Sequence, residues 1–203
     1  LLSVIIPVYN SELFLERCIK SIIAQRISDA EFIFINDGST DSSHEILEFY
    51  KEKDNRIIVI NQENLGVSRA RNKALSICKG KYVGFVDADD YIDRRMFELL
   101  LMKILNDKSD LVICNYTKIY YENELQIKKD IIFKENNYEN DITNYYIEYF
   151  CKNHDNGYLW NKLYRSEVIK NNNLKYYIAQ KLITPKKTKN SNNMIRKIKT
   201  HVI

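Results

Sequence analysis

An apolar run that ends abruptly in carboxylates constrains this chain more than any other stretch. Residues 82–86 read Tyr-Val-Gly-Phe-Val, and Asp87, Asp89 and Asp90 follow at once. Such a run is typical of a strand buried on both faces, and open α/β sheets bind ligands at the carboxyl ends of their strands. Three neighbouring aspartates repel one another, so we expect a divalent cation, Mg²⁺ or Mn²⁺, among them. The alternative is a solvated acidic turn before a helix.

Strands and helices alternate along the chain around this run. The sequence predicts strands over 3–9, 32–35, 57–60, 82–86 and 111–114, and helices after Ser11 and over 43–51, 66–78 and 96–105. In the first helix we expect Leu13, Leu15 and Ile19 on the apolar face, and Gln25 with the polar residues. This alternation predicts an α/β fold whose mostly parallel sheet carries helices on both faces.

Polar and aromatic residues follow three of the predicted strands, in segments 7–10, 36–39 and 87–90. Parallel strands open at one edge of a sheet, where the helix after Gly66 also begins and where its N–H groups could meet a phosphate. An aromatic ring, a lone aspartate, a helix N-terminus and an acid cluster together indicate a nucleotide diphosphate site. Taken singly, Tyr9 reads as a core residue, Asp37 as a turn residue and Gly66 as a loop residue.

Composition excludes several classes of protein. No stretch approaches the ~18 apolar residues of a transmembrane helix, and no signal-peptide pattern is visible. Residues 1–167 hold 22 Lys or Arg against 27 Asp or Glu, a net charge of −5, which argues against a nucleic-acid partner. The cysteines lack metal-binding spacing, so we expect reduced thiols in a cytoplasmic protein. They are Cys18, Cys78, Cys114 and Cys151.

Five segments jointly resemble the family 2 glycosyltransferases. They are SVIIPVYN at 3–10, INDGSTD at 35–41, NLGVSRARN at 64–72, GKYVGFVDADD at 80–90 and LWNKLYR at 159–165. The resemblance covers about residues 3–175 and implies an inverting enzyme with a Rossmann-like fold of the GT-A type. It implies a nucleotide-sugar-binding half over 1–115 and a small, incomplete acceptor half over 116–178. A basic tail over 179–203 is expected to be disordered.

The resemblance also implies roles for individual residues. Pro7 and Tyr9 would line the base pocket, and Asp37 would bind uracil. Asp87 would face the ribose or the metal, and Asp89 would hold Mg²⁺ or Mn²⁺ on the diphosphate. Arg71 and Asn72 match the family pattern without an assignable contact. The implied reaction moves a sugar from a UDP-sugar to a glycan or lipid-linked acceptor in surface polysaccharide synthesis.

The general base is where this chain departs from the family. Inversion needs a base within hydrogen-bond reach of the acceptor, and the family's acid pair usually follows the Trp-Asn-Lys-Leu-Tyr segment, but no carboxylate follows Glu167. We therefore expect a chain truncated near residue 177. Asp155 is a weak candidate for the base, as is His154, and both are more simply explained as polar loop residues. The alternative function is a catalytically incomplete remnant that binds nucleotide sugar and metal.

Trp160 and the basic tail can each be interpreted in two ways. Trp160 either stacks on an acceptor sugar or packs as a core aromatic. The basic tail either rests on the anionic inner face of the plasma membrane or forms a solvated end, and its lack of an amphipathic pattern favours the second interpretation. A nucleotidyltransferase is a remote third function, because the first strand is not followed by a glycine-rich phosphate loop.

Overall fold

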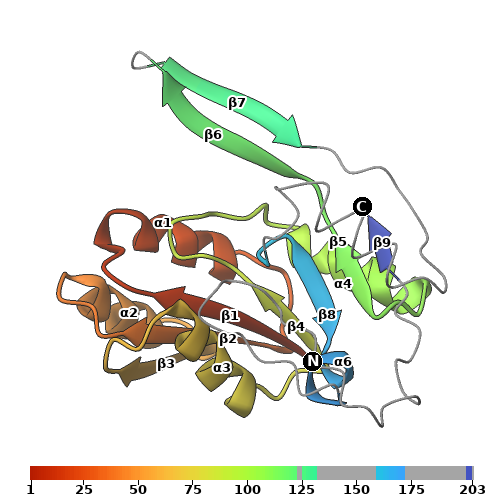
Figure 1. The fold of residues 1–203 in the computed structure, drawn as a ribbon, viewed down its shortest axis with the longest axis horizontal. Coiled ribbons are helices and arrows are strands. Elements are labelled where there is room, and N and C mark those ends of the chain that lie inside the picture. The colour runs from red at the N-terminus through yellow and green to blue at the C-terminus, as the bar shows by residue number, and fades with distance from the viewer. Residues whose placement is uncertain (123–124, 132–158, 172–199, 203) are drawn as a thin grey trace, which may run out of the picture.

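The computed structural model describes residues 1–122, 125–131, 159–171 and 200–202 (Figure 1). These residues form one seven-stranded sheet and a separate two-stranded hairpin. The strands are β1 (Leu2–Val8), β2 (Ala30–Asp37), β3 (Ile57–Gln62), β4 (Tyr82–Phe85), β5 (Leu111–Ile113), β6 (Tyr116–Glu122), β7 (Leu125–Ile131), β8 (Lys162–Arg165) and β9 (Thr200–Val202). The helices are α1 (Glu12–Ile23), α2 (Ser43–Lys51), α3 (Val67–Ile77), α4 (Met96–Asn106) and α6 (Ser166–Asn171).

The large sheet has the strand order β3-β2-β1-β4-β8-β5-β9. β1 runs parallel to β2 and β4, and β2 runs parallel to β3, so the expected α/β fold with a mostly parallel sheet is confirmed. β8 is antiparallel to both β4 and β5, with Gly84 opposite Leu163. Because of this reversed direction, β8 begins where β4 ends. Trp160 and Asn161, which precede β8, therefore lie at the same edge of the sheet as Asp87.

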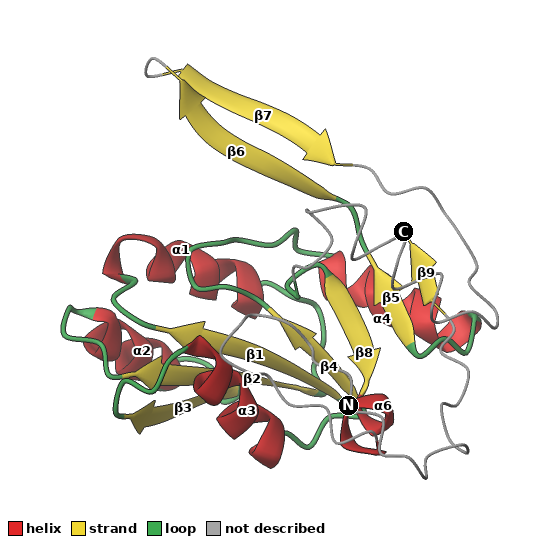
Figure 2. Ribbon diagram, in the orientation of Figure 1, coloured by secondary structure: helices red, strands yellow, loops and turns green. Residues whose placement is uncertain are grey.

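Helices cover both faces of the sheet, as expected (Figure 2). Alternate side chains of β1 point to opposite faces, so Val4 and Ile6 belong to the core under α1, α2 and α4, whereas Ile5 belongs to the core under α3 and α6. This double burial is why the central strands read as uninterrupted apolar runs. In the parts of the chain that the structure describes, no helix is long and apolar enough to cross a membrane.

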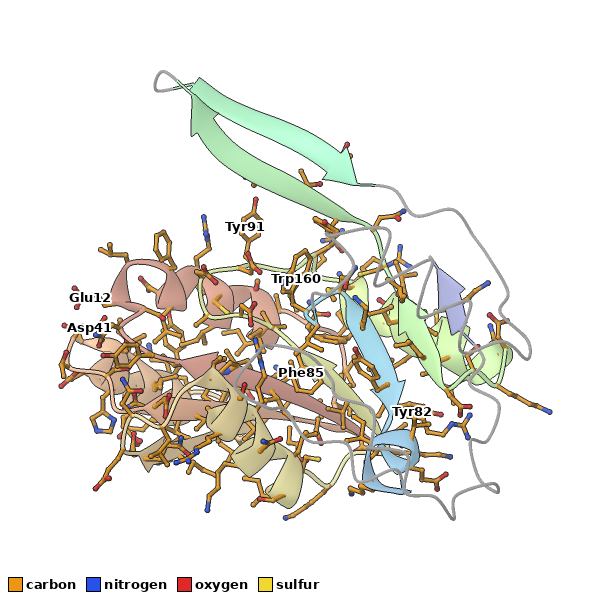
Figure 3. All side chains as sticks on the ribbon, viewed as in Figure 1. Glu12, Asp41, Tyr82, Phe85, Tyr91 and Trp160 are labelled. Carbon is orange, nitrogen blue, oxygen red and sulfur yellow. The ribbon has the colours of Figure 1, made fainter. Side chains whose placement is uncertain are left out.

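The N-termini of α1 and α2 cap each other beside the ends of β1 and β2. The N–H of Glu12 donates to the Asp41 carboxylate at 3.0 Å, and the N–H of Ser42 donates to the Glu12 carboxylate at 2.9 Å. Glu12 and Asp41 lie together at this corner in Figure 3. Neither N-cap serine, Ser11 nor Ser42, makes a side-chain cap bond of its own. Each helix N-terminus thus has one backbone N–H group bound by a carboxylate from the other helix or its preceding turn, and these bonds hold the two helices together.

Two side chains near α1 contradict the sequence prediction. Leu13 is 83% exposed, because it lies about half a turn away from the buried positions Leu15, Ile19 and Ile22. Gln25, predicted among the polar surface residues, is only 2% exposed. It lies just past the end of α1, where its amide finds buried hydrogen-bond partners in the chain that follows β4.

The segment 116–178 contributes the hairpin of β6 and β7, which projects beyond the sheet (Figure 1). The sequence did not predict this hairpin as a unit, nor the short strand β8. In the segment 179–203, for which we expect disorder, residues 200–202 form β9 and pair with β5. The remainder of that segment lies outside the described residues, as do Asp155, His154 and Cys151.

Candidate functional site

The carboxyl ends of β1, β2 and β4 meet the start of α3 at one edge of the sheet. Pro7, Tyr9 and Asp37 line one pocket of about 180 Å³ there, together with Val8, Asn64, Gly66 and Val67. Pockets that enclose a whole small-molecule ligand measure roughly 300–1,000 Å³. This pocket can therefore seat one ring of a ligand, with the remainder lying along the sheet edge. Tyr9, 49% exposed, stands at the pocket and can offer its ring face to a planar group.

Asp37 is the fixed point of the pocket. Its side chain accepts three hydrogen bonds, from Gln62 Nε2 at 2.7 Å, Leu65 N–H at 2.9 Å and Gly66 N–H at 2.8 Å. Two of these bonds go to Oδ1 and one to Oδ2. A carboxylate offers about four lone-pair positions, so Oδ2 keeps one for a further donor. The amide of Gly66 therefore binds Asp37 and not a phosphate, and the expected phosphate contact of the N–H groups that follow it in α3 stays a prediction.

Two glycines let the chain close around Asp37. Gly38 has φ +73°, and a Cβ added to it would lie 2.7 Å from the backbone nitrogen of Asn64. Gly66, with φ +89°, is the N-cap of α3. Both backbone conformations disfavour other residues. The turn after β2 can approach the loop before α3 because Gly38 carries no side chain, whereas Gly66 supplies the positive φ from which α3 begins.

Asp87 pairs with Arg71 of α3. Arg71 Nη2 donates to Asp87 Oδ1 at 2.7 Å, and Arg71 itself is buried. Burial raises the pKa of Asp87, Arg71 counteracts that rise, and the charge of Asp89 adds to it. We name Asp87, Asp89 and Asp90 the acid cluster. Arg71, for which the sequence indicated no contact, therefore holds the first carboxylate of this cluster toward α3.

The acid cluster still carries unbalanced negative charge. Burial, together with Asp89 and Asp87, raises the pKa of Asp90 to about 6, and Arg17 only partly opposes this. Asp89 is exposed, and Arg17 Nη2 donates to its backbone oxygen at 3.0 Å. A divalent cation would relieve the repulsion, so the residues fit Mg²⁺ or Mn²⁺ in charge and ligand chemistry.

No three His, Cys, Asp or Glu side chains form a ready metal site within the ranges that the structure describes. Mg²⁺ is commonly bound through one or two carboxylates, with water and substrate phosphates completing its shell. Asp89 and Asp87 suit that kind of site, in which the ligand supplies part of the coordination.

β8 brings a second group of residues to the same edge, and sequence reasoning missed most of them. The Trp160 ring packs edge-to-face on Tyr116 at 4.6 Å between centroids. Asn161 Nδ2 donates to the backbone oxygen of Cys114 at 3.2 Å, and Lys162 Nζ donates to Asn161 Oδ1 at 2.6 Å. Lys162 is 1% exposed, and burial lowers its pKa to about 7. The only signal in the sequence was the LWNKLYR segment.

Figure 3 labels Tyr91 and Trp160, two aromatic residues in the part of the molecule that holds α1 and the start of β8. Tyr91 follows the acid cluster and packs against the Arg17 guanidinium, 4.7 Å from its ring centroid. Trp160 precedes β8. The contact with Tyr116 supports packing of the Trp160 ring, and its stacking on an acceptor sugar stays a prediction.

Comparison with known proteins places the chain in a family. The family model described as "Glycosyl transferase family 2" matches residues 3–172. The "Uncharacterized glycosyltransferase EpsJ" of Bacillus subtilis (strain 168) is 36% identical over 174 residues, which make up 86% of this chain and 50% of that protein. The "Cholesterol galactosyltransferase" of Borreliella burgdorferi is 36% identical over 181 residues, 85% of this chain and 50% of that protein. The chain thus spans about half the length of these curated relatives.

Solved structures show the same fold. S. aureus TarS 1-349 in complex with UDP superposes with a TM-score of 0.73 and 24% identity, over 100% of this chain and 57% of that one. The mannosyltransferase PcManGT from Pyrobaculum calidifontis, solved with GDP-Man and Mn²⁺, gives a TM-score of 0.59 at 16% identity, over 84% of this chain and 46% of that one. At these identities the likeness concerns the fold, the Rossmann-like GT-A type that the sequence predicted.

Proposed function

The chain belongs to glycosyltransferase family 2, and from that premise we propose that it transfers a hexose or N-acetylhexosamine from a UDP-sugar, with inversion. The proposed acceptor is a glycan or lipid-linked sugar in surface polysaccharide synthesis. The observation that carries the proposal is Asp37, held by three donors beside a ring-sized pocket with one acceptor position left. That position suits the imino N–H of uracil. The UDP and UDP-GlcNAc complexes of TarS support the same donor class.

The acid cluster would receive the diphosphate. Asp89 and Asp87 are the proposed ligands of Mg²⁺ or Mn²⁺, with Asp87 oriented by Arg71. The chemistry that the cation supplies when bound is neutralisation of the leaving diphosphate. Asp90 contributes negative charge next to this position without being a proposed ligand. Pro7 and Tyr9 would hold the base, so base and diphosphate would lie along the ends of β1, β2 and β4.

The general base has no assignment among the described residues. Asp155 remains the weak candidate and lies outside them. The second candidate function is binding of nucleotide sugar and metal without transfer, because the described residues provide a donor site but no assigned general base. Both functions use the same donor site, and only turnover separates them.

A cytoplasmic location belongs to the proposal, because reduced thiols are typical of proteins in that compartment. Cys18, Cys78 and Cys114 are free thiols in the structure. Contact of the basic tail with an anionic membrane face stays a prediction. Vesicle binding by the chain and by a variant lacking 181–203 tests it, and equal binding would remove the membrane role.

Calorimetric titration of UDP with and without Mn²⁺ tests the donor site, on the parent chain, Asp37→Ala and Asp89→Ala. We expect Mn²⁺ to strengthen UDP binding to the parent, Asp89→Ala to lose that Mn²⁺ effect, and Asp37→Ala to lose binding in both conditions. Release of UDP from UDP-sugars on the same samples then distinguishes transferase from remnant. Absence of UDP binding to the folded parent would overturn both functions.

A further inference from the structure

The chain between β4 and α4 carries the acid cluster without any helix or strand of its own. We name residues 86–95 the acid loop; they form only turns and irregular structure. Its internal backbone hydrogen bonds include Asp90 N–H to Asp87 O at 3.0 Å, and Met96 N–H binds back to Asp93 O at 3.0 Å. Because the loop has few hydrogen bonds of its own, its path depends on contacts with neighbouring elements.

The contacts that fix the path of the acid loop come from one face of α1 and from Gln25, which lies just beyond that helix. Arg17, Ser21 and Gln25 are spaced four residues apart, so they lie in one row, which we name the polar ridge. Arg17 donates to Asp89 O at 3.0 Å, and Ser21 Oγ accepts from Ile92 N–H at 3.1 Å. The bonds of the ridge go to main-chain atoms of the acid loop, so they define its path whatever its side chains are.

Gln25 makes the most demanding of these contacts. Its Nε2 donates to Asp93 O at 2.7 Å and to Ser21 O at 3.2 Å, while its Oε1 accepts from Phe97 N–H at 3.1 Å. The amide is almost completely buried, so each lost bond would leave an unsatisfied polar group. Gln25 therefore ties the acid loop at Asp93 and the helix that follows it at Phe97.

The bond to Phe97 is a helix cap supplied from outside the helix. The N-cap of α4 is Arg95, whose side chain makes no cap bond, and the N–H of Phe97 is one of the N-terminal donors that a helix leaves unpaired. Gln25 satisfies it in place of an N-cap side chain. The start of α4 is thus fixed both by local hydrogen bonds to Asp93 and by Gln25, a residue 72 positions before Phe97 in the chain.

Gln25 is itself held in place. Its backbone oxygen accepts from Arg56 Nη1 at 3.2 Å, and Arg56 is paired with Asp54 through Nη2 at 2.6 Å. The Arg56 guanidinium lies over the Phe32 ring of β2, 4.8 Å from its centroid. Arg56 therefore anchors the Gln25 end of the polar ridge to the sheet. Because this end is held in place, its hydrogen bonds can hold the acid loop in place.

From these contacts we infer that the polar ridge, with Gln25 as its main member, positions Asp89 for the divalent cation and diphosphate, while Arg71 orients Asp87. Gln25, Ser21 and Arg17 act through the backbone of the acid loop and are positioning residues. The inference rests on the proposed donor site and adds to it the elements that set its metal affinity. Loss of a residue that orients metal ligands typically lowers metal affinity about 10–100-fold.

The test compares Gln25→Leu, of similar size but without polar atoms, with the parent. In the metal-free protein we expect backbone amides of residues 89–97 to exchange faster with solvent, while those of β3 keep the parental rate. We expect the Kd of Mn²⁺ for the UDP-bound protein, measured from the spin resonance of free Mn²⁺, to rise about 10–100-fold. UDP binding without metal, which depends on Tyr9 and Asp37, should stay within about twofold, since these residues do not touch the ridge.

Two controls separate positioning from general loss of stability. Ile33→Val lowers stability from the core on the other face of the sheet, whose buried cluster contains no residue of the acid loop, and it should leave the Kd of Mn²⁺ unchanged. Ser21→Ala removes the acceptor for Ile92 and should weaken Mn²⁺ binding, whereas Ser21→Thr keeps the hydroxyl and should restore it. The serine pair also serves if Gln25→Leu does not fold.

Parental Mn²⁺ affinity in folded Gln25→Leu, or in Ser21→Ala, would overturn the inference while leaving the donor site intact. Equal losses of Mn²⁺-dependent and metal-free UDP binding would also overturn it, since that pattern means general disruption. If the parent itself shows no Mn²⁺ effect on UDP, the proposed donor site fails, and the positioning role fails with it. Faster exchange at 89–97 with weakened Mn²⁺ binding supports the inference.

Discussion

The guanidinium of Arg71, in the middle of α3, donates to the carboxylate of Asp87, just beyond β4, at 2.7 Å. Side chains of α3 and β4 share one buried cluster, and the Arg71–Asp87 pair joins α3, which begins beside the pocket of Tyr9 and Asp37, to the acid cluster. The proposed base and diphosphate positions are thus linked by one charged hydrogen bond.

Breaking the Arg71–Asp87 pair should destabilise the protein, and the effects of substitutions at the two residues should not be additive. Arg71→Gln removes the charge that counteracts the burial of Asp87, and we expect it to lower the free energy of unfolding at pH 7 by about 1–3 kcal/mol. Asp87→Asn in the Arg71→Gln background should cost less than it does alone, because the carboxylate no longer has its partner. Urea unfolding of both single variants and the double variant measures this coupling. Strictly additive effects would show that the 2.7 Å contact contributes nothing.

Asp37 should matter both to stability and to UDP. Asp37→Ala leaves the N–H groups of Leu65 and Gly66 without their acceptor, and we expect a loss of about 1–3 kcal/mol in the free energy of unfolding. UDP binding should fall at least about tenfold, the value of one good hydrogen bond to a charged group. Asp29→Asn is the control, since Asp29 is an exposed carboxylate far from the pocket, paired with the N-terminus. Equal effects of both variants would contradict the role of Asp37.

Asp90 makes the metal-free protein less stable as the pH rises. Its pKa is raised from 3.8 to about 6 in the folded chain, so the folded state favours the protonated acid. Its contribution to stability is complete below pH 4 and is lost as the pH rises through 6. Asp90→Asn should therefore raise the free energy of unfolding at pH 7 by about 1–3 kcal/mol, and the gain should vanish near pH 4.

Unfolding of parent and Asp90→Asn in urea at pH 4, 5.5 and 7, in the presence of a chelator, measures this gain. A pH-independent difference between the two proteins would be evidence against the raised pKa. Addition of Mn²⁺ at pH 7 should stabilise the parent by mass action, and should do so less in Asp89→Ala.

Any side chain at Gly84 in β4 should lower the stability of the protein while Phe97 is present. A Cβ at this position would collide with the Phe97 ring of α4, and we expect Gly84→Ala to cost about 1–3 kcal/mol, as overpacking in a core does. Phe97→Leu shortens the opposing side chain and should make the added methyl group less costly than in the parent. Thermal unfolding of the two single variants and the double variant checks this, and an equal cost in both backgrounds would place the clash elsewhere.

Lys162 should make stability rise between pH 7 and pH 10. Burial lowers its pKa from 10.5 to about 7, so the unfolded chain binds more protons over this range. A lowered pKa contributes stability above pH 10.5 that is lost as the pH falls through 7. Lys162→Met lacks this dependence, so its stability relative to the parent should decrease by about 1–3 kcal/mol from pH 7 to pH 10.

Chemical unfolding of parent and Lys162→Met at pH 7, 8.5 and 10 measures this relative change. Lys170→Met, which removes an exposed lysine, is the matched control and should show a flat difference. Parallel curves for parent and Lys162→Met would mean that the buried ammonium keeps an ordinary pKa.

Most of the α/β scaffold could be predicted from the sequence. Helix α2 begins and ends at the predicted residues, Ser43 and Lys51, and β1 to β5 lie where apolar runs predicted strands. β8 was missed because four residues of strand after a Trp-Asn turn carry too little periodicity to be distinguished from a loop. The burial of Gln25 was missed because a glutamine next to a helix is normally exposed.

The sequence by itself determined the alternation of strands and helices and the residues at the strand ends, Tyr9, Asp37 and Asp87 to Asp90. Hydrophobic period and turn residues are local properties, and they can be read over a few positions. Only the tertiary structure decided that Asp37 binds the start of α3, 28 and 29 positions away, and that Gln25 caps α4, 72 positions away. Such contacts depend on which elements become neighbours when the chain buries its apolar faces, and no local pattern encodes that choice.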